Sequence, residues 1–185
     1  PLMEALGDWR FKAYAALGLG LLGQKEAVGP LLKEYKALVS AGEEKTAACF
    51  AIAIGALGDE SHVNELAEPL RRPGNETLKV FICQALGRIP CKESKKWLLR
   101  ALADKDKEAK AAAVLSLAEF QDKQVFSALL SGKTFKSVRM AQAYSQVALA
   151  RFAIGLVDND NVRDAVLRLP HLFARKSAED LVVAM

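Results

Sequence analysis

A recurring column of small residues is the feature that most constrains the fold of this chain. Aligned on one glycine, the small positions lie 35, 32, 31 and 37 residues apart: Gly20, Gly55, Gly87, Ala118 and Gly155. The residue before each is Leu or Ile, the residue two before is small, the residue two after is large and apolar, and the residue eleven after is aliphatic. A period of this length is typical of stacked helical hairpins. The sequence therefore predicts about five such units.

Helical spacing supports this interpretation. Before the small column the apolar residues keep one helical face, as in Phe50, Ala53, Ile54 and Leu57, and a second apolar stripe follows the column. No segment alternates like a β-strand. Residues suited to cap helices precede several predicted first and second helices: Asp8, Asn75, Asp106, Asp59 and Asp122. We expect an all-α fold, a right-handed α-solenoid of about five helical hairpins.

The glycines at Gly18-x-Gly20-x-x-Gly23 have the spacing of a dinucleotide-binding turn. That turn needs a preceding strand in a βαβ unit, and no strand pattern is present. Close packing between helices explains the two column glycines, because each costs a helix interior about 1 kcal/mol relative to alanine. Gly23 and Gly58 suit the turn into a second helix.

Composition excludes several classes of protein. A net charge of +4 and 51% hydrophobic residues over 185 residues are typical of a globular domain. Three cysteines without C-x-x-C spacing argue against a disulfide framework and a zinc site, which favours a cytoplasmic location. The longest apolar run is shorter than a membrane span. Because the chain opens on Pro1, we expect a fragment of a longer protein whose targeting signal is not visible here.

The units resemble the bacterial HEAT-like repeats named after phycobilisome lyases. Their pattern, roughly V-R-x-x-A-A-x-A-L-G-x-L-G-D followed by A-V-x-x-L-L, is found in "FKAYAALGLGLLGQKEAVGPLL" and "AACFAIAIGALGDESHVNEL". It recurs in "LKVFICQALGRIPCKESKKWLL" and "AKAAAVLSLAEFQDKQVFSALL". The resemblance covers residues 8–169 and implies antiparallel helix pairs whose second helices line a concave surface. The junction "LADKDKEAK" also resembles the Asp-rich junction of that family, and its charged part reads as a solvated surface.

The repeat columns divide a single solenoid, residues 1–185, into units with approximate bounds. The units are 8–42, 43–74, 75–104, 105–132 and 135–169, followed by a C-terminal helix at 170–185. The fifth unit departs from the pattern, because its first helix is longer and its register is less regular. Residues 1–6 look like the end of a preceding second helix, and Trp9 is expected to pack on a preceding unit.

Candidate binding residues lie on the face of each second helix that points away from its own first helix. Trp97 occupies such a position, beside Lys96 and one turn before Arg100. An exposed Trp among cations is typical of an anchor for a protein partner. The alternative is that Trp97 covers a gap against an adjacent unit with its ring half buried. The basic residues of the second and third units could form one patch for an acidic partner: Arg71, Arg72, Lys92, Lys95, Lys96 and Arg100.

No catalytic, cofactor-binding or metal-binding constellation is evident. His62 falls at the edge of a core stripe, where a structural role is expected, and His171 has no partner at metal-ligand spacing. Neither histidine is followed by Glu, so the His-Glu motifs of the iron-dependent HEAT-like hydroxylases are missing. Cys49 and Cys83 stand among apolar residues, as inert buried thiols do.

The leading hypothesis is a non-enzymatic scaffold that binds a protein partner, or another domain of its own chain, on the concave face. We expect no cofactor, no membrane partner and no small-molecule substrate. Resemblance leaves two alternatives open. One is the handling of a bilin chromophore, as by phycobilin lyases, and the other is DNA binding on a basic concave face, as in HEAT-like alkylpurine glycosylases.

Overall fold

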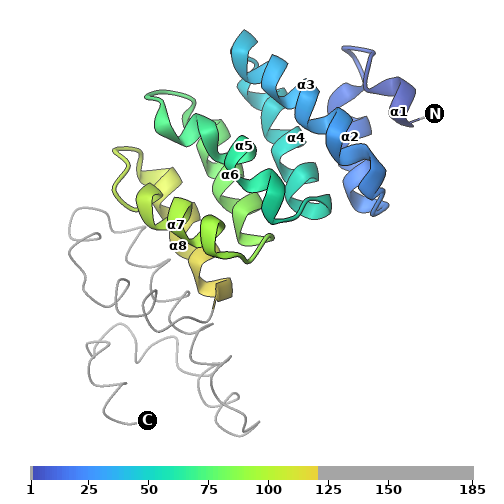
Figure 1. The fold of residues 1–185 in the computed structure, drawn as a ribbon. Helices are drawn as coiled ribbons and strands as arrows, with labels where there is room; N and C mark the ends of the chain where they lie inside the picture. The colour runs from blue at the N-terminus through green and yellow to red at the C-terminus, as the bar shows by residue number, and fades with distance from the viewer. Residues whose placement is uncertain (1, 121–185) are drawn as a thin grey trace, which may run out of the picture.

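The computed structural model describes residues 2–120, and all regular structure in that range is helical (Figure 1). The α-helices are α1 (Leu2–Ala5), α2 (Lys12–Leu21), α3 (Val28–Ala41), α4 (Glu44–Leu57), α5 (Val63–Ala67), α6 (Glu76–Gly87), α7 (Lys92–Ala101) and α8 (Lys107–Leu117). Short 3-10 helices are η1 (Lys25–Ala27), η2 (Glu60–His62), η3 (Glu68–Arg71) and η4 (Ala118–Phe120). The predicted fifth unit, the second helix of the fourth unit and the segment 170–185 lie outside the described residues.

Successive hairpins stack in two layers. Helices α2, α4, α6 and α8 pack on one another in order and form the first-helix layer. Helices α3, α5 and α7, with η3, form the second-helix layer, and they pack on the first helices of their own or the next unit. Figure 1 shows the hairpins following one another along a single stack. The prediction of an all-α solenoid is confirmed.

The repeat columns form the core between these layers. The Leu or Ile that precedes the small column has no exposed surface in any of the four described units: Leu19, Ile54, Leu86 and Leu117. The aliphatic residue eleven positions after the column is equally buried at Leu31, Leu66 and Leu98. Each such side chain contributes roughly 1.5–3 kcal/mol by its burial. The columns therefore mark the residues that hold the hairpins together.

The column glycines allow neighbouring first helices to touch at their backbones. A Cβ atom built on Gly55 would lie 2.6 Å from the Ala85 Cα, closer than side chains approach one another. On Gly20 it would lie 3.1 Å from the Ala53 Cα, and on Gly87 it would lie 2.8 Å from the Ser116 Cβ. In each pair the small column of one unit faces the small residue two before the column of the next. Helix packing therefore explains these glycines.

The two turn glycines differ from each other. Gly23 has a φ of +69°, a left-handed conformation that glycine adopts without strain. Gly58 has a φ of −77°, so its backbone is not left-handed. A Cβ on Gly58 would instead lie 2.7 Å from the Ile54 carbonyl oxygen, and this close approach explains the small residue.

Two of the predicted caps are confirmed. The Asp59 carboxylate accepts a hydrogen bond from the Ser61 amide at 3.0 Å, and the Asp106 carboxylate accepts one from the Glu108 amide at 2.9 Å. His62 Nδ1 accepts a hydrogen bond from the Asp59 amide at 3.2 Å, so this histidine has a structural role in the cap. Asn75 does not cap α6, because its backbone is left-handed (φ +56°) and its side chain makes no capping bond.

Asp8 bonds to Arg10 rather than capping α2. Its carboxylate accepts hydrogen bonds from the Arg10 amide at 3.0 Å and from the Arg10 guanidinium at 2.8 Å. The helix begins later, at Lys12, with no side-chain cap.

The junction between the third and fourth units contains a buried ion pair. Lys79 Nζ on α6 lies 2.7 Å from Asp104 Oδ2, and the two side chains are only 5% and 15% exposed. Burial by itself would raise the pKa of Asp104. Hydrogen bonds from the Asp106 amide and the Lys79 ammonium group outweigh it, so the pKa lies below the ordinary value. The Asp104 carboxylate, which α6 and the junction enclose, directly precedes the charged stretch 105–110 that is expected to be solvated.

Candidate partner-binding surface

Trp97 is buried between two second helices. Its side chain is 4% exposed, and its indole Nε1 donates a hydrogen bond to Asn64 Oδ1 at 3.0 Å. A position on α7 that points away from its own first helix faces α5 of the preceding unit rather than solvent. Of the two interpretations of Trp97, the exposed anchor is therefore wrong. The structure agrees with the alternative, in which Trp97 packs against an adjacent unit. The ring is almost fully buried, whereas a half-buried ring was expected.

Two arginines stack on the Trp97 ring. The guanidinium carbon of Arg71, on η3, lies 4.9 Å from the ring centroid, and that of Arg100, on α7, lies 5.4 Å from it. Both distances fall within the range of cation–π attraction. Because both guanidinium carbons are held against one ring, they are at most about 10 Å apart. We call this arrangement the Arg71–Trp97–Arg100 stack.

Within residues 2–120, neither arginine of the stack is paired with a carboxylate, although both side chains are exposed. Two neighbouring basic residues of the predicted patch, Arg72 and Lys96, are paired with carboxylates. Arg72 donates a hydrogen bond to Glu68 at 2.9 Å, and Lys96 donates one to Glu93 at 3.4 Å. The guanidinium groups of Arg71 and Arg100 therefore keep free N–H groups and unneutralised charge on the surface.

A second group of predicted residues lines a cleft along α7. Lys92, Lys96 and Arg100 line this cleft with Lys95 and Leu99, and its volume is about 470 Å³. Through Arg100 it adjoins the Arg71–Trp97–Arg100 stack. Six of the seven residues predicted to bind a partner thus lie in the stack or in this α7 cleft.

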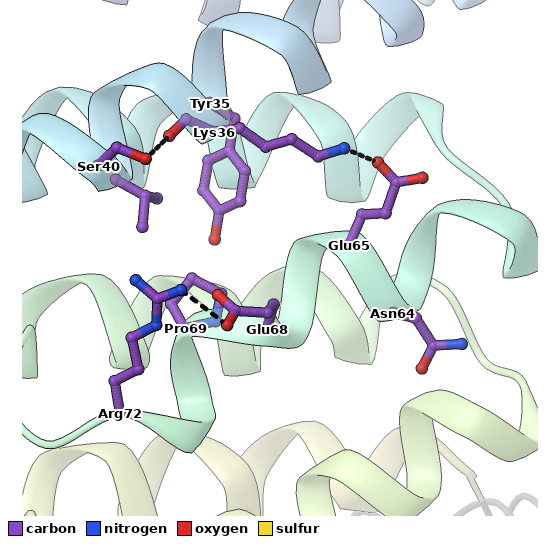
Figure 2. Close-up of a pocket in the computed structure, with 9 residues that line it drawn as sticks. Tyr35, Lys36, Ser40, Asn64, Glu65, Glu68, Pro69 and Arg72 are labelled. Atoms are coloured by element: carbon purple, nitrogen blue, oxygen red, sulfur yellow. Dashed lines mark hydrogen bonds and ion pairs between the residues drawn. The ribbon is translucent and has the colours of Figure 1, made fainter.

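The remaining predicted residue, Arg72, lines a groove between α3 and η3 that sequence analysis missed (Figure 2). The groove has a volume of about 480 Å³, and Tyr35, Val39 and Pro69 give it an apolar lining. We call it the α3–η3 groove.

Ion pairs flank the α3–η3 groove. Lys36 pairs with Glu65 across the two second helices, and Arg72 pairs with Glu68. Figure 2 shows the Lys36–Glu65 pair beside Tyr35 and the Arg72–Glu68 pair beyond its hydroxyl end. The charges on the rim are therefore already matched.

The lining of the groove is fixed by a hydrogen bond between units. The Tyr35 hydroxyl donates to the Leu66 carbonyl oxygen at 2.8 Å, which ties α3 to α5. Burial, with a smaller contribution from the charge of Glu68, raises the pKa of Tyr35, so the hydroxyl stays a neutral donor. The sequence feature that could have indicated the groove is Pro69. Proline cannot donate a helical hydrogen bond, and Pro69 follows the end of α5 at Ala67.

The described thiols and histidine belong to the protein framework. Burial raises the pKa of Cys83 to about 12 and also raises the pKa of Cys49, so both are protonated at neutral pH. His62 is held in the Asp59 cap. In the portion the structure describes, no group of three or more His, Cys, Asp or Glu side chains is arranged to hold a metal ion.

No helix within residues 2–120 combines the length and the hydropathy needed to cross a membrane.

Comparison with known families agrees with this architecture. Residues 63–145 match the sequence model of HEAT repeats, from the start of α5 to beyond the described residues. No curated protein shows significant sequence similarity to the chain. The matched segment contains the stacked pairs α5–α6 and α7–α8, and the same column spacing continues in the units before it. Residues 63–145 are therefore similar to HEAT repeats, and the stacked hairpins of residues 2–120 agree with this similarity.

Proposed function

We propose that this chain is a non-enzymatic scaffold that binds an acidic protein partner, or an acidic part of its own polypeptide, on the second-helix layer. HEAT repeats generally serve protein interaction, because stacked units present a long continuous surface. We take the second-helix layer to be the concave face of the solenoid.

The Arg71–Trp97–Arg100 stack carries this proposal. A guanidinium group is planar and can donate two parallel hydrogen bonds to the two oxygens of a carboxylate. Stacking on a buried ring limits the conformations of both arginines before binding, which lowers the entropy lost when a partner docks. Trp97 acts here by positioning the arginines, since its own ring is 4% exposed.

The first-helix layer offers a different kind of surface. Its small column residues lie against the next first helix, and its pocket of about 380 Å³ between α6 and α8 has one cation, Arg88, and one carboxylate, Glu119, in its lining. The second-helix layer instead has the α3–η3 groove between helices and the α7 cleft along α7, where four cations line one cleft. This difference supports placing the binding surface on the second-helix layer.

Paired charge reversals test the proposal. We expect the Arg71→Glu/Arg100→Glu variant to lose the partners that the unchanged chain recovers by affinity purification. Arg88→Glu is the matched control, because Arg88 is exposed at the end of α6 in the first-helix layer. Recovery of the same partners by all three proteins would overturn the proposal, provided that circular dichroism shows equal helicity.

A further inference from the structure

Shared contacts link the α3–η3 groove, the stack and the α7 cleft, and we call these three linked features the track. Asn64 lines the groove and accepts the hydrogen bond of Trp97. Arg100 stacks on the same Trp97 and lines the cleft. On η3, Pro69 of the groove precedes Arg71 of the stack by two residues. These contacts therefore link all three features across the second-helix layer.

The groove end of the track suits an uncharged apolar side chain. Tyr35, Val39 and Pro69 supply its apolar lining, and the volume of about 480 Å³ can take a large side chain. A charged side chain would gain little here, because the cations and carboxylates on the rim already pair with each other.

The opposite end suits carboxylates. Arg71 and Arg100 present unneutralised guanidinium groups, and Lys92 adds an exposed ammonium group in the cleft. Positive charge is concentrated at Arg71 and along α7, whereas Glu65 and Glu68 line the groove. A nucleic acid carries phosphate along its whole length and would meet those carboxylates. A peptide can place its acidic residues at one end only.

The geometry of the layer sets the length of such a peptide. Neighbouring packed helices lie about 8–10 Å apart, so a ligand that crosses from α3 to α7 spans about 20 Å. An extended chain advances about 3.3 Å per residue, which gives about six residues.

We infer that the second-helix layer recognises an extended segment of about six residues, with one large apolar side chain in the α3–η3 groove and acidic residues at the Arg71–Trp97–Arg100 stack and the α7 cleft. This inference rests on the proposed function and specifies the sequence pattern of the partner segment. The apolar residue and the acidic residues stand at opposite ends of the segment, so the segment binds in one direction.

Selection from a random heptapeptide display library against the whole chain tests this inference. We expect enriched peptides to carry one Leu, Ile, Met, Phe or Trp separated by about three to five residues from two or more Asp or Glu residues. Enrichment of acidic peptides without the apolar residue would overturn it, as would no enrichment. Tighter binding of a six-nucleotide single-stranded RNA than of the best peptide would also overturn it.

Two variants with matched controls locate the enriched peptide. Ser40→Trp fills the groove, and Ala37→Trp places the same side chain on an exposed position of α3 outside it. Arg71→Gln/Arg100→Gln removes both charges, and Arg88→Gln is its control. We expect each of the first-named variants to weaken peptide binding about tenfold or more in fluorescence anisotropy, with the controls unchanged.

The results separate this inference from the proposed function. If Ser40→Trp binds the peptide like the unchanged chain while the arginine variant does not, the groove assignment is wrong and the acidic-partner proposal stands. If the arginine variant also binds normally, the peptide uses another surface. In that case the inference is wrong. The proposed function is tested independently, by affinity purification with the charge-reversal variants.

Discussion

The two layers of this solenoid are held together in different ways. First helices touch through glycine, alanine and serine, with the column glycines lying almost directly on the backbone or Cβ of the next unit. Second helices are joined by two long aromatic side chains, Tyr35 to the Leu66 carbonyl and Trp97 to Asn64. The small contacts repeat in every described unit, whereas the aromatic contacts differ at each junction. One layer therefore sets the stack, and the other is free to vary its surface.

Truncating Trp97 is expected to have the largest effect on the second-helix layer. Trp97→Ala removes a buried ring, the hydrogen bond to Asn64 and the support of both arginines, and should lower the free energy of unfolding by about 3–5 kcal/mol. Urea denaturation measures the change. Trp9→Ala is the matched control, because Trp9 is 80% exposed and its loss should cost less than about 0.5 kcal/mol. Equal losses for the two variants would show that Trp97 does not join the units.

The Lys79–Asp104 pair provides a third kind of contact, between a first helix and a junction. Lys79→Met leaves the Asp104 carboxylate without its cation and should cost about 3 kcal/mol at pH 7. Lys96→Met, which disturbs an exposed pair with Glu93, should cost less than about 1 kcal/mol. Comparable costs in urea denaturation would mean that burial of the Lys79 pair is unimportant.

The same pair predicts an acid-sensitive contribution to stability. The pKa of Asp104 is lower in the folded than in the unfolded chain, so folding favours the charged carboxylate. This contribution is fully present above the ordinary aspartate pKa and is lost as the pH falls through the lowered folded value. Denaturation curves of the Lys79→Met variant should therefore show a weaker dependence on pH in this acid range than those of the unchanged chain. An identical dependence would contradict the assignment.

Removing the Tyr35 hydroxyl should have a smaller effect. Tyr35→Phe keeps the buried ring but loses the hydrogen bond to Leu66, and we expect a cost of about 1 kcal/mol. Tyr14→Phe serves as the reference, because the Tyr14 side chain is 75% exposed, and we expect no measurable change there. A neutral Tyr35→Phe would mean that the ring alone joins α3 to α5.

The features that recur in every unit could be predicted from the sequence. Column positions such as Ile54 and Leu66 are buried because each unit places them between its two helices, and this environment recurs with the period. Helical periodicity therefore predicts the hairpins and the core, and the recurring small residues predict the first-helix contacts.

The second-helix surface was harder to predict, because it depends on two different units at once. Periodicity within α7 indicates which face points away from its first helix, but not that α5 covers this face at Trp97. The α3–η3 groove likewise depends on how Pro69 ends one helix and where Tyr35 of the preceding unit lies. Charge clustering brought Arg71 and Arg100 into the candidate set. That both arginines stack on one buried ring could not be predicted from the sequence and is seen only in the structure.

One substitution made in both layers tests the central claim most directly. Gly55 lies in α4 against Ala85, whereas Gly29 lies in α3 with open space where a Cβ would stand. We predict that Gly55→Ala lowers the free energy of unfolding by about 1–3 kcal/mol through overpacking, despite the better helix propensity of alanine. Gly29→Ala should raise it by about 0.5–1 kcal/mol. Opposite signs in urea denaturation would support the difference between the layers, and a gain in stability from both substitutions would contradict it.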